Sequence, residues 1–147
     1  MREDPRRRDI GAYPFQIDMV PRFGDMDLNR HLNNVAVGRF YEEGRVRFHF
    51  DLHRRPGLEG FRVFIAHLAI DYLAEGHWPD PLRIGVGVVH VGGSSYRLGL
   101  AMFQRGGCIG LCDSVLAYRG ERNGEQGAAP LPSLLREALE GFRLRAE

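Results

Sequence analysis

Residues 25–55 read DMDLNRHLNNVAVGRFYEEGRVRFHFDLHRR, and this segment predicts the architecture of the chain. Its second half carries apolar side chains three or four residues apart, the spacing of an amphipathic helix. These side chains are Val37, Phe40, Tyr41 and Phe48. Asn33 or Asn34 is a suitable N-cap, because an amide oxygen accepts a hydrogen bond from one of the unpaired first-turn N–H groups. We expect the helix to end among residues 53–55, before a Pro-Gly pair.

Predicted strands flank this helix. Residues 13–23 alternate apolar and polar side chains and predict a first strand, which Pro21 interrupts. After the helix the apolar period changes to two, and the predicted strands are 61–73, 82–91, 96–104 and 109–119. Turn-forming residues separate these strands, which indicates an antiparallel meander. Residues 121–127 predict a loop, and residues 132–142 predict a short amphipathic helix.

One long helix followed by a meander excludes a doubly wound parallel sheet, because no helices come between the later strands. The prediction is an α+β fold, in which an antiparallel sheet of about five strands wraps around a long central helix. Gly38 and Gly44 lie inside that helix, where each costs roughly 1 kcal/mol relative to Ala. A closely approaching backbone would explain both glycines.

The composition limits the classes of function. A chain of 147 residues fits one domain, and a formal net charge of +1 provides no uniform field for nucleic acid or an anionic membrane. Two cysteines, Cys108 and Cys112, have neither disulfide nor metal-site spacing and are interpreted as core thiols. We expect residues 1–12, which include four arginines, to form a flexible basic tail and residues 13–147 to form a single domain.

The sequence contains no apolar run of membrane-spanning length and no secretory signal. Together with the missing disulfide framework, this predicts a cytoplasmic protein.

Acids, amides and an imidazole are concentrated in residues 25–34, directly before the helix. A helix N-terminus offers free N–H groups and a partial positive charge, which can stabilise a carbonyl oxygen that becomes negative during acyl transfer. The backbone N–H of Asn34 or Val35 is suitably placed. A nearby carboxylate would then attack the acyl carbonyl or activate water. An Asx turn that leads into a helix cap explains the same amides without catalysis.

This segment resembles the hotdog-fold thioesterases of the 4-hydroxybenzoyl-CoA and long-chain acyl-CoA thioesterase group. The Asp-x-Asp, His-Val-Asn-Asn and Glu-Ala-Arg elements of that group correspond here to residues 25–27, 31–34 and 43–45. Weaker similarities follow in order at residues 70–73 and 92–95. The resemblance covers most of the chain and implies the hotdog fold.

The resemblance also implies roles for individual residues. Asp27 would be the nucleophile or general base, and Asp25 would be structural. A loop of plant acyl-ACP thioesterases is still more similar, which implies that Asn29 and His31 orient groups or handle protons and that Glu75 belongs to the site. Asn34 completes the expected catalytic set. The expected substrate-binding residues are Val35, Arg30, Ser94, Ser95 and Arg97.

Two positions depart from the family pattern. Val37 occupies a position where relatives usually have Tyr, which would change the shape of the acyl pocket. Arg30 occupies a position where bacterial members often have Gly, which would alter access or contact an anionic ligand.

The predicted function is hydrolysis of an acyl-CoA or acyl-carrier-protein thioester to a free acid and a thiol, without a metal or cofactor. No nucleic-acid or membrane partner is expected. A single hotdog leaves a sheet edge exposed, which predicts a homodimer or a dimer of dimers. One alternative is a hotdog hydratase or dehydratase acting on enoyl or 3-hydroxyacyl thioesters, although those enzymes separate Asp and His by one residue more than Asp27 and His31. The other is a non-catalytic acyl-CoA binder.

Overall fold

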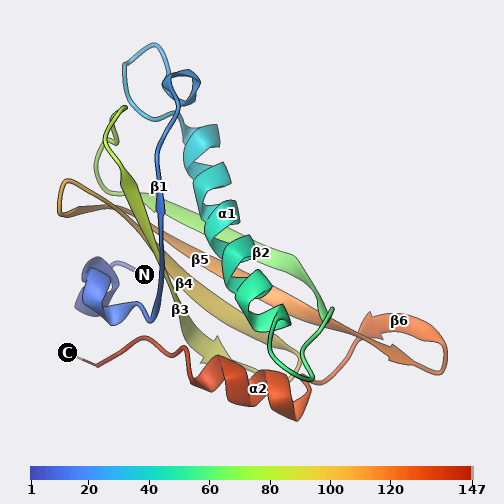
Figure 1. Ribbon diagram of the computed structural model, residues 1–147. Coiled ribbons are helices and arrows are strands. Elements are labelled where there is room, and N and C mark those ends of the chain that lie inside the picture. Colours follow the sequence, from blue (N-terminus) through green and yellow to red (C-terminus); the bar gives the residue numbers. More distant parts are fainter. Residues whose placement is uncertain (147) are drawn as a thin grey trace.

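The computed structural model describes residues 1–146. A curled antiparallel sheet packs against the long helix α1 (Asn34–His53), and the short helix α2 (Ser133–Glu140) covers one end of the sheet (Figure 1). The strands are β1 (Phe15–Met19), β2 (Arg62–Tyr72), β3 (Leu82–Val91), β4 (Ser95–Gln104), β5 (Gly107–Arg122) and β6 (Glu125–Ala128). Their order is β1-β3-β4-β5-β2, and β6 pairs with β5. The predicted α+β arrangement is therefore confirmed.

The main core lies between α1 and the inner face of the sheet. Tyr41, Phe48 and Leu52 on α1 are fully buried, and each such side chain contributes on the order of 2 kcal/mol of apolar burial. Gly44 permits the closest approach, because a Cβ atom there would lie 2.9 Å from Cγ2 of Ile84 on β3. The sheet does lie close to Gly44, but the nearest atoms belong to side chains and not to the backbone that we expected. For Gly38 the expectation is wrong, because a Cβ atom there would meet no other group within 4 Å.

Two predicted elements differ from the observed ones. The first strand is shorter than residues 13–23: it ends at Met19, and residues 23–25 form a short 3-10 helix. Residues 121–127 do not form a loop alone. They include the end of β5, a tight turn and the start of β6. Asn123 and Gly124 both have positive φ angles, 55° and 79°, which is the conformation of an Asn-Gly hairpin turn.

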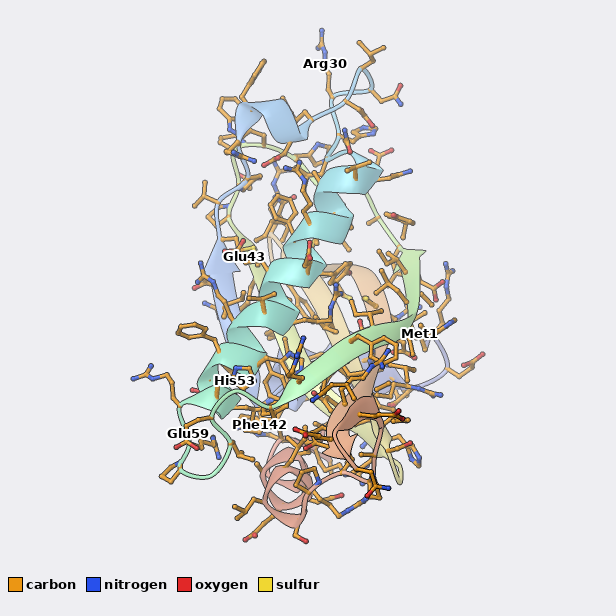
Figure 2. All side chains as sticks on the ribbon, turned by 90° about the vertical axis from the view of Figure 1, so that its right-hand side faces the viewer. Met1, Arg30, Glu43, His53, Glu59 and Phe142 are labelled. Carbon is orange, nitrogen blue, oxygen red and sulfur yellow. The ribbon has the colours of Figure 1, made fainter. Side chains whose placement is uncertain are left out.

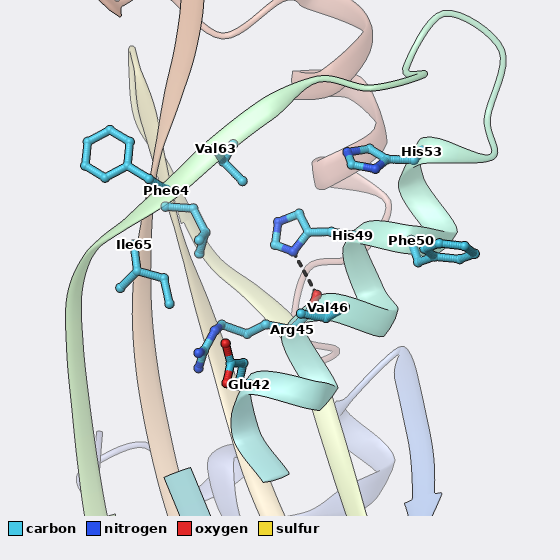
Figure 3. A pocket seen from close by; sticks show the side chains of 10 residues that line it. Glu42, Arg45, Val46, His49, Phe50, His53, Val63, Phe64 and Ile65 are labelled. Carbon is cyan, nitrogen blue, oxygen red and sulfur yellow. Dashed lines mark hydrogen bonds between the residues drawn. The ribbon is translucent and has the colours of Figure 1, made fainter. Parts of the chain in front are cut away.

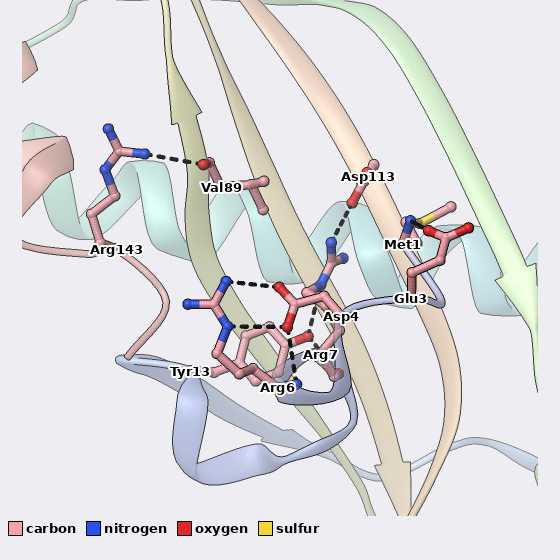
Figure 4. Close-up of polar contacts among 9 residues, drawn as sticks. All are labelled: Met1, Glu3, Asp4, Arg6, Arg7, Tyr13, Val89, Asp113 and Arg143. Atoms are coloured by element: carbon pink, nitrogen blue, oxygen red, sulfur yellow. Dashed lines mark hydrogen bonds and ion pairs between the residues drawn. The ribbon is translucent and has the colours of Figure 1, made fainter. Parts of the chain in front are cut away.

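The N-terminal segment, for which the sequence predicted a flexible tail, forms two 3-10 helices, Pro5–Arg8 and Ile10–Ala12. Arg7 anchors this segment against the face of the sheet opposite α1 (Figure 4). The Arg7 side chain is buried, with only 2% of the residue exposed. Its guanidinium donates hydrogen bonds to the carboxylate of Asp113 at 2.7 Å, to the hydroxyl of Tyr13 at 3.1 Å and to backbone carbonyls of β4 and β5. A count of charged residues could not distinguish this buried, fully paired arginine from its exposed neighbours.

Within residues 1–146, no helix is long and apolar enough to cross a membrane. Cys108 is half-buried and Cys112 is buried, and both carry free thiols. Figure 2 shows α1 along its whole length, from the loop that carries Arg30 to His53 at the opposite end.

Candidate functional site

The first turn of α1 is organised by Asn33. Its side-chain oxygen accepts hydrogen bonds from the backbone N–H groups of Val35 at 2.7 Å and Ala36 at 3.1 Å, so Asn33 is the N-cap. The N–H of Val35 therefore already donates a hydrogen bond to the capping side chain. Among the residues that the structure describes, no hydrogen bond uses the N–H of Asn34. Asn34 thus supplies the candidate oxyanion donor, which sequence reasoning had left open between these two residues.

Asp25 holds the preceding loop against α1. Its carboxylate is buried, pairs with the guanidinium of Arg39 at 3.1 Å and accepts a hydrogen bond from the backbone N–H of Arg22 at 2.7 Å. Its backbone carbonyl also accepts a hydrogen bond from the N–H of Asn33. These contacts tie the loop to the capping residue, so the position of the next acid is set relative to the helix N-terminus.

Asp27 lies in an exposed turn beside that N-terminus. Oδ1 of its carboxylate accepts hydrogen bonds from the N–H of Asn29 at 2.8 Å and, more weakly, from the N–H of His31 at 3.4 Å. The backbone N–H of Asp27 donates to the carbonyl of His31 at 2.9 Å. The Asx turn considered as the non-catalytic explanation is therefore present. It occupies Oδ1, whereas no hydrogen bond of the described residues uses Oδ2.

Arg30 lies at the tip of this turn with a φ angle of 63°, a left-handed conformation that costs most residues about 1 kcal/mol or more and Gly very little. A glycine adopts this φ angle easily, which explains why bacterial members of the family are expected to have Gly at position 30. The Arg30 side chain points away from the body of the protein (Figure 2).

A pocket of about 280 Å³ opens beside Asp27. All five residues of the expected catalytic set contribute to its lining: Asp27, Asn29, His31, Asn34 and Glu75. They come from two segments, the loop before α1 and the chain that follows β2. The structure therefore brings together side chains more than forty positions apart in the sequence.

His31 and Glu75 join the two segments. Nε2 of His31 lies 2.8 Å from a carboxylate oxygen of Glu75, and the His77 ring packs edge-on at 5.5 Å from the His31 ring. The backbone N–H of Leu32 donates to the carbonyl of Gly76 at 2.8 Å. A Cβ atom on Gly76 would lie 2.6 Å from Leu32, so a glycine is needed where the segments touch.

Of the apolar wall of this pocket, the sequence pointed only to Val37. Gly110 on β5 pairs with Tyr72 on one side and Met102 on the other, so one row across three strands forms part of the wall. Val37 of α1 also lines the pocket, at the position where relatives were expected to carry Tyr. One signal was available: Tyr72 lies in the weakly family-like segment 70–73.

Tyr41 lies one helical turn after Val37. Its hydroxyl is the one buried side-chain oxygen or nitrogen without a hydrogen-bond partner within the described part of the chain. A Cβ atom on Gly110 would lie 2.6 Å from this oxygen. Burial raises the pKa of Tyr41 well above its usual value, so the hydroxyl stays protonated behind the pocket wall.

Five expected substrate-binding residues lie elsewhere or face away. Neither Arg30 nor Val35 lines the pocket. Ser94, Ser95 and Arg97 belong to the β3–β4 hairpin, at the other end of β4 from Met102, roughly 20 Å away at 3.3 Å per residue. Arg136 of α2 donates to the carbonyl of Gly92 in this hairpin at 2.8 Å. Within one chain, the hairpin does not reach the pocket.

Two exposed arginines that the phosphates of a carrier could otherwise contact have protein partners. Arg83 donates to Asp18 at 2.7 Å, and Arg105 pairs with Asp80. In residues 1–146, no group of three or more His, Cys, Asp or Glu side chains is arranged to hold a metal ion.

Comparisons with known proteins agree with the observed fold. Residues 21–139 match the family model described as the thioesterase-like superfamily. A thioesterase from Thermus thermophilus, solved with coenzyme A and zinc, is 27% identical, with 92% of this chain and 98% of that chain covered and a TM-score of 0.77. A protein from Pseudomonas aeruginosa is 22% identical over 92% and 96% of the two chains, also with a TM-score of 0.77.

A 4-hydroxybenzoyl-CoA thioesterase mutant, solved with 4-hydroxybenzoyl-CoA, shares the fold at 12% identity, with a TM-score of 0.72 over 85% of this chain and 97% of that one. No curated protein sequence matches the chain. The family match covers the capped helix, the loop that carries Asp27 and all the main strands after it, and the resemblance recognised in the sequence is confirmed. This chain belongs to the thioesterase-like superfamily and has its hotdog fold.

Proposed function

We propose that the protein hydrolyses acyl thioesters of coenzyme A or of an acyl carrier protein, with Asp27 as nucleophile or general base. One observation carries this proposal. The carboxylate of Asp27 and the N-terminus of α1 border the same pocket, together with His31 and Glu75. A reacting carbonyl can therefore be polarised and attacked in one place. The coenzyme A bound to the Thermus thermophilus thioesterase supports the choice of carrier.

In the proposed reaction, the thioester carbonyl oxygen accepts a hydrogen bond from the N–H of Asn34 and faces the positive end of the helix dipole. Oδ2 of Asp27 attacks the carbonyl carbon, or it removes a proton from a water molecule that attacks. If Asp27 attacks, a C–O bond to Oδ2 forms as the C–S bond breaks, and water then cleaves the acyl–Asp27 anhydride to the free acid and restores the carboxylate. If Asp27 acts as a base, the C–O bond forms to water and Asp27 holds the proton of that water. In both routes the thiol leaves as a thiolate that takes up a proton. The Asx turn on Oδ1 positions the carboxylate and leaves Oδ2 for the chemistry.

His31 is proposed as a positioning and proton-handling residue. Glu75 holds its Nε2, which orients the ring at the pocket edge. The leaving thiolate needs only a weak acid, because thiols have pKa values near 8.5. We therefore expect loss of His31 to reduce turnover less than loss of Asp27.

A thiol-release assay across short, long and aromatic acyl-CoA thioesters tests the function. Asp27→Asn keeps the size and the turn-forming oxygen but removes the charge, and we expect kcat/KM to fall by about 10²- to 10⁴-fold. Asp18→Asn on β1 is the matched control, since Asp18 is exposed and outside the pocket. A folded Asp27→Asn protein with wild-type turnover would remove Asp27 from the mechanism.

The same assay separates the alternatives. Binding of acyl-CoA without thiol release by the wild-type protein would indicate a non-catalytic binder. Hydration of an enoyl-CoA without thiol release would indicate a hydratase.

The proposed functional unit is a homodimer that pairs through β2. This strand is an edge of the sheet and carries the partly exposed apolar side chains Phe64, Ile65, Leu68 and Tyr72. Tyr72 also lines the pocket, so the dimer contact would border the proposed active site.

A further inference from the structure

A second cavity, of about 340 Å³, lies between the later turns of α1 and the first half of β2 (Figure 3). It shares no lining residue with the pocket at Asp27. Arg45, which lines it, comes eleven residues after Asn34 and is therefore roughly 16 Å further along the helix axis. Most of its walls are apolar: Val46, Phe50, Val63, Phe64, Ile65 and Leu116.

Arg45 is the unusual member of this lining. Its side chain is only 5% exposed, and its guanidinium points from α1 toward β2 (Figure 3). The guanidinium carries five N–H donors. Among the described residues, the one oxygen that accepts from it is the hydroxyl of Ser114, in a long contact of 3.4 Å from Nη1. Arg7, which is equally buried, makes an ion pair and three further hydrogen bonds. Within residues 1–146, Arg45 is therefore a largely buried cation with few protein acceptors, and none of its unpartnered nitrogens is fully shut off from solvent.

The neighbouring groups do not supply the missing acceptor. Nδ1 of His49 donates to the backbone carbonyl of Arg45 at 2.7 Å, so its Nε2 accepts from the hydroxyl of Tyr96. Burial lowers the pKa of His49 to about 4, which keeps this ring neutral near pH 7. His53, also in the lining, uses its Nε2 to contact the carbonyl of Phe61 at 3.1 Å.

The other titratable groups around Arg45 leave its charge incompletely balanced. The thiol of Cys112 on β5 lies within hydrogen-bonding reach of the Arg45 guanidinium, but burial raises the pKa of this thiol, so it carries no charge near pH 7. Glu42 lies beside Arg45 in Figure 3, but it is exposed, and no ion pair between the two is found in the described part of the chain. The cavity therefore combines apolar walls with one incompletely paired positive charge.

We infer that this cavity binds an organic monocarboxylate with an apolar body, such as a medium-chain or aromatic acid. The planar guanidinium matches a carboxylate in two-point geometry, and the single negative charge of the ligand balances the single charge of Arg45. A phosphate monoester fits less well, since it carries up to two negative charges near pH 7 and Glu42 would repel it. The inference does not depend on the thioesterase proposal, because it uses none of the residues at the Asp27 pocket.

Isothermal titration of the full-length protein with octanoate, octan-1-ol and octyl phosphate tests the inference. We expect octanoate to bind at least 10-fold more tightly than the other two ligands. Arg45→Met keeps an unbranched apolar side chain but removes the charge, and it should weaken octanoate binding at least 10-fold. Arg47→Met is the matched control, since Arg47 is exposed on α1 and pairs with Glu43. Its octanoate affinity should equal that of the wild-type protein.

Glu42→Gln removes the competing carboxylate and should leave octanoate binding unchanged or tighter. Val63→Trp fills the cavity while keeping Arg45, so it should abolish binding even if Arg45→Met does not fold. Equal affinity for octanoate and octanol, or tighter binding of octyl phosphate, would overturn the inference. Full octanoate affinity in folded Arg45→Met or folded Val63→Trp would also overturn the inference.

A variant of the other pocket shows which site binds the ligand. Asp27→Asn should retain octanoate binding. Loss of octanoate binding in Asp27→Asn would place octanoate in the pocket at Asp27 and contradict the assignment.

Discussion

Two histidines illustrate how local surroundings decide what an imidazole does. His31 is half-buried and its Nε2 contacts the carboxylate of Glu75 at the edge of the pocket. His49 lies between α1 and the sheet. Its Nδ1 contacts the backbone carbonyl of Arg45 and its Nε2 contacts the hydroxyl of Tyr96, and both partners are uncharged. Burial lowers the pKa of His49 to about 4. The first ring lies in the candidate site, where we proposed that it handles protons, and the second ring is neutral near pH 7 and packs between α1 and the sheet.

The depressed pKa of His49 makes stability depend on pH. Between pH 6.5 and about 4 the unfolded chain binds a proton at this position and the folded protein does not, so the free energy of unfolding falls as the pH falls through that window. We expect a loss of roughly 2 kcal/mol between pH 7 and pH 4.5 from this residue. Urea unfolding at both pH values measures it. His49→Gln should lose about that much less stability on acidification than the wild-type protein.

The control is His90→Gln, because His90 is exposed on β3. It should show the wild-type pH dependence. An unchanged pH dependence in His49→Gln would show that His49 does not titrate as its burial requires.

Most of the candidate site residues lie in one segment, residues 25–34, where the family pattern pointed to Asp27. Glu75 lies far from this segment in the sequence and was predicted only through the family resemblance. The buried cation Arg45 and the unpartnered hydroxyl of Tyr41 were not found, because the identity of a residue does not reveal whether its hydrogen-bonding groups find partners.

Among the elements, α1 depends on its N-cap for both stability and function. Asn33→Ala removes the oxygen that accepts from the N–H groups of Val35 and Ala36, and we expect a loss of about 1 kcal/mol in the free energy of unfolding. The first turn would also lose definition, so the N–H of Asn34 would be less well placed and kcat should fall. Urea unfolding and the thiol-release assay measure the two effects.

Asn34→Ala is the stability control. The Asn34 side chain is exposed and makes no hydrogen bond within residues 1–146, so this variant should unfold within about 0.5 kcal/mol of the wild-type protein. A larger loss for Asn34→Ala than for Asn33→Ala would contradict the assignment of the cap.

Element boundaries followed from the sequence where side-chain period and turn residues agree. Residues 82–91 form β3 as predicted, because apolar residues continue up to clear turn residues at both ends. The β6 hairpin was missed, because Asn123 and Gly124 were interpreted as loop residues although their pair favours a tight turn between strands. The N-terminal 3-10 helices were missed because they depend on Arg7 reaching Asp113, a contact between residues far apart in the sequence.

At the scale of the whole molecule, the two edges of the sheet differ. β1 spans five residues, whereas β2 spans eleven and carries several partly exposed apolar side chains. Long apolar edges are uncommon in monomers, because their unpaired backbone groups pair readily with another chain. The bulge between Ile65 and His67 does not divide β2 into short pieces, since pairing with β5 continues on both sides of it. This edge is therefore the surface through which we expect two copies to join.

Leu68→Lys tests that assembly. Leu68 lies within β2 and is 43% exposed in the single chain, and a lysine there would bring one positive charge from each copy into a two-fold interface. We expect sedimentation equilibrium to show a wild-type dimer and a Leu68→Lys monomer at micromolar concentration, with the dissociation constant raised at least 100-fold. Leu134→Lys changes a similarly exposed leucine on α2 and should stay dimeric. Tyr72 is the last residue of β2 and also lines the pocket at Asp27. The monomeric variant should therefore also lose thioesterase activity. A dimeric Leu68→Lys protein, or a monomeric wild-type protein, would contradict pairing through β2.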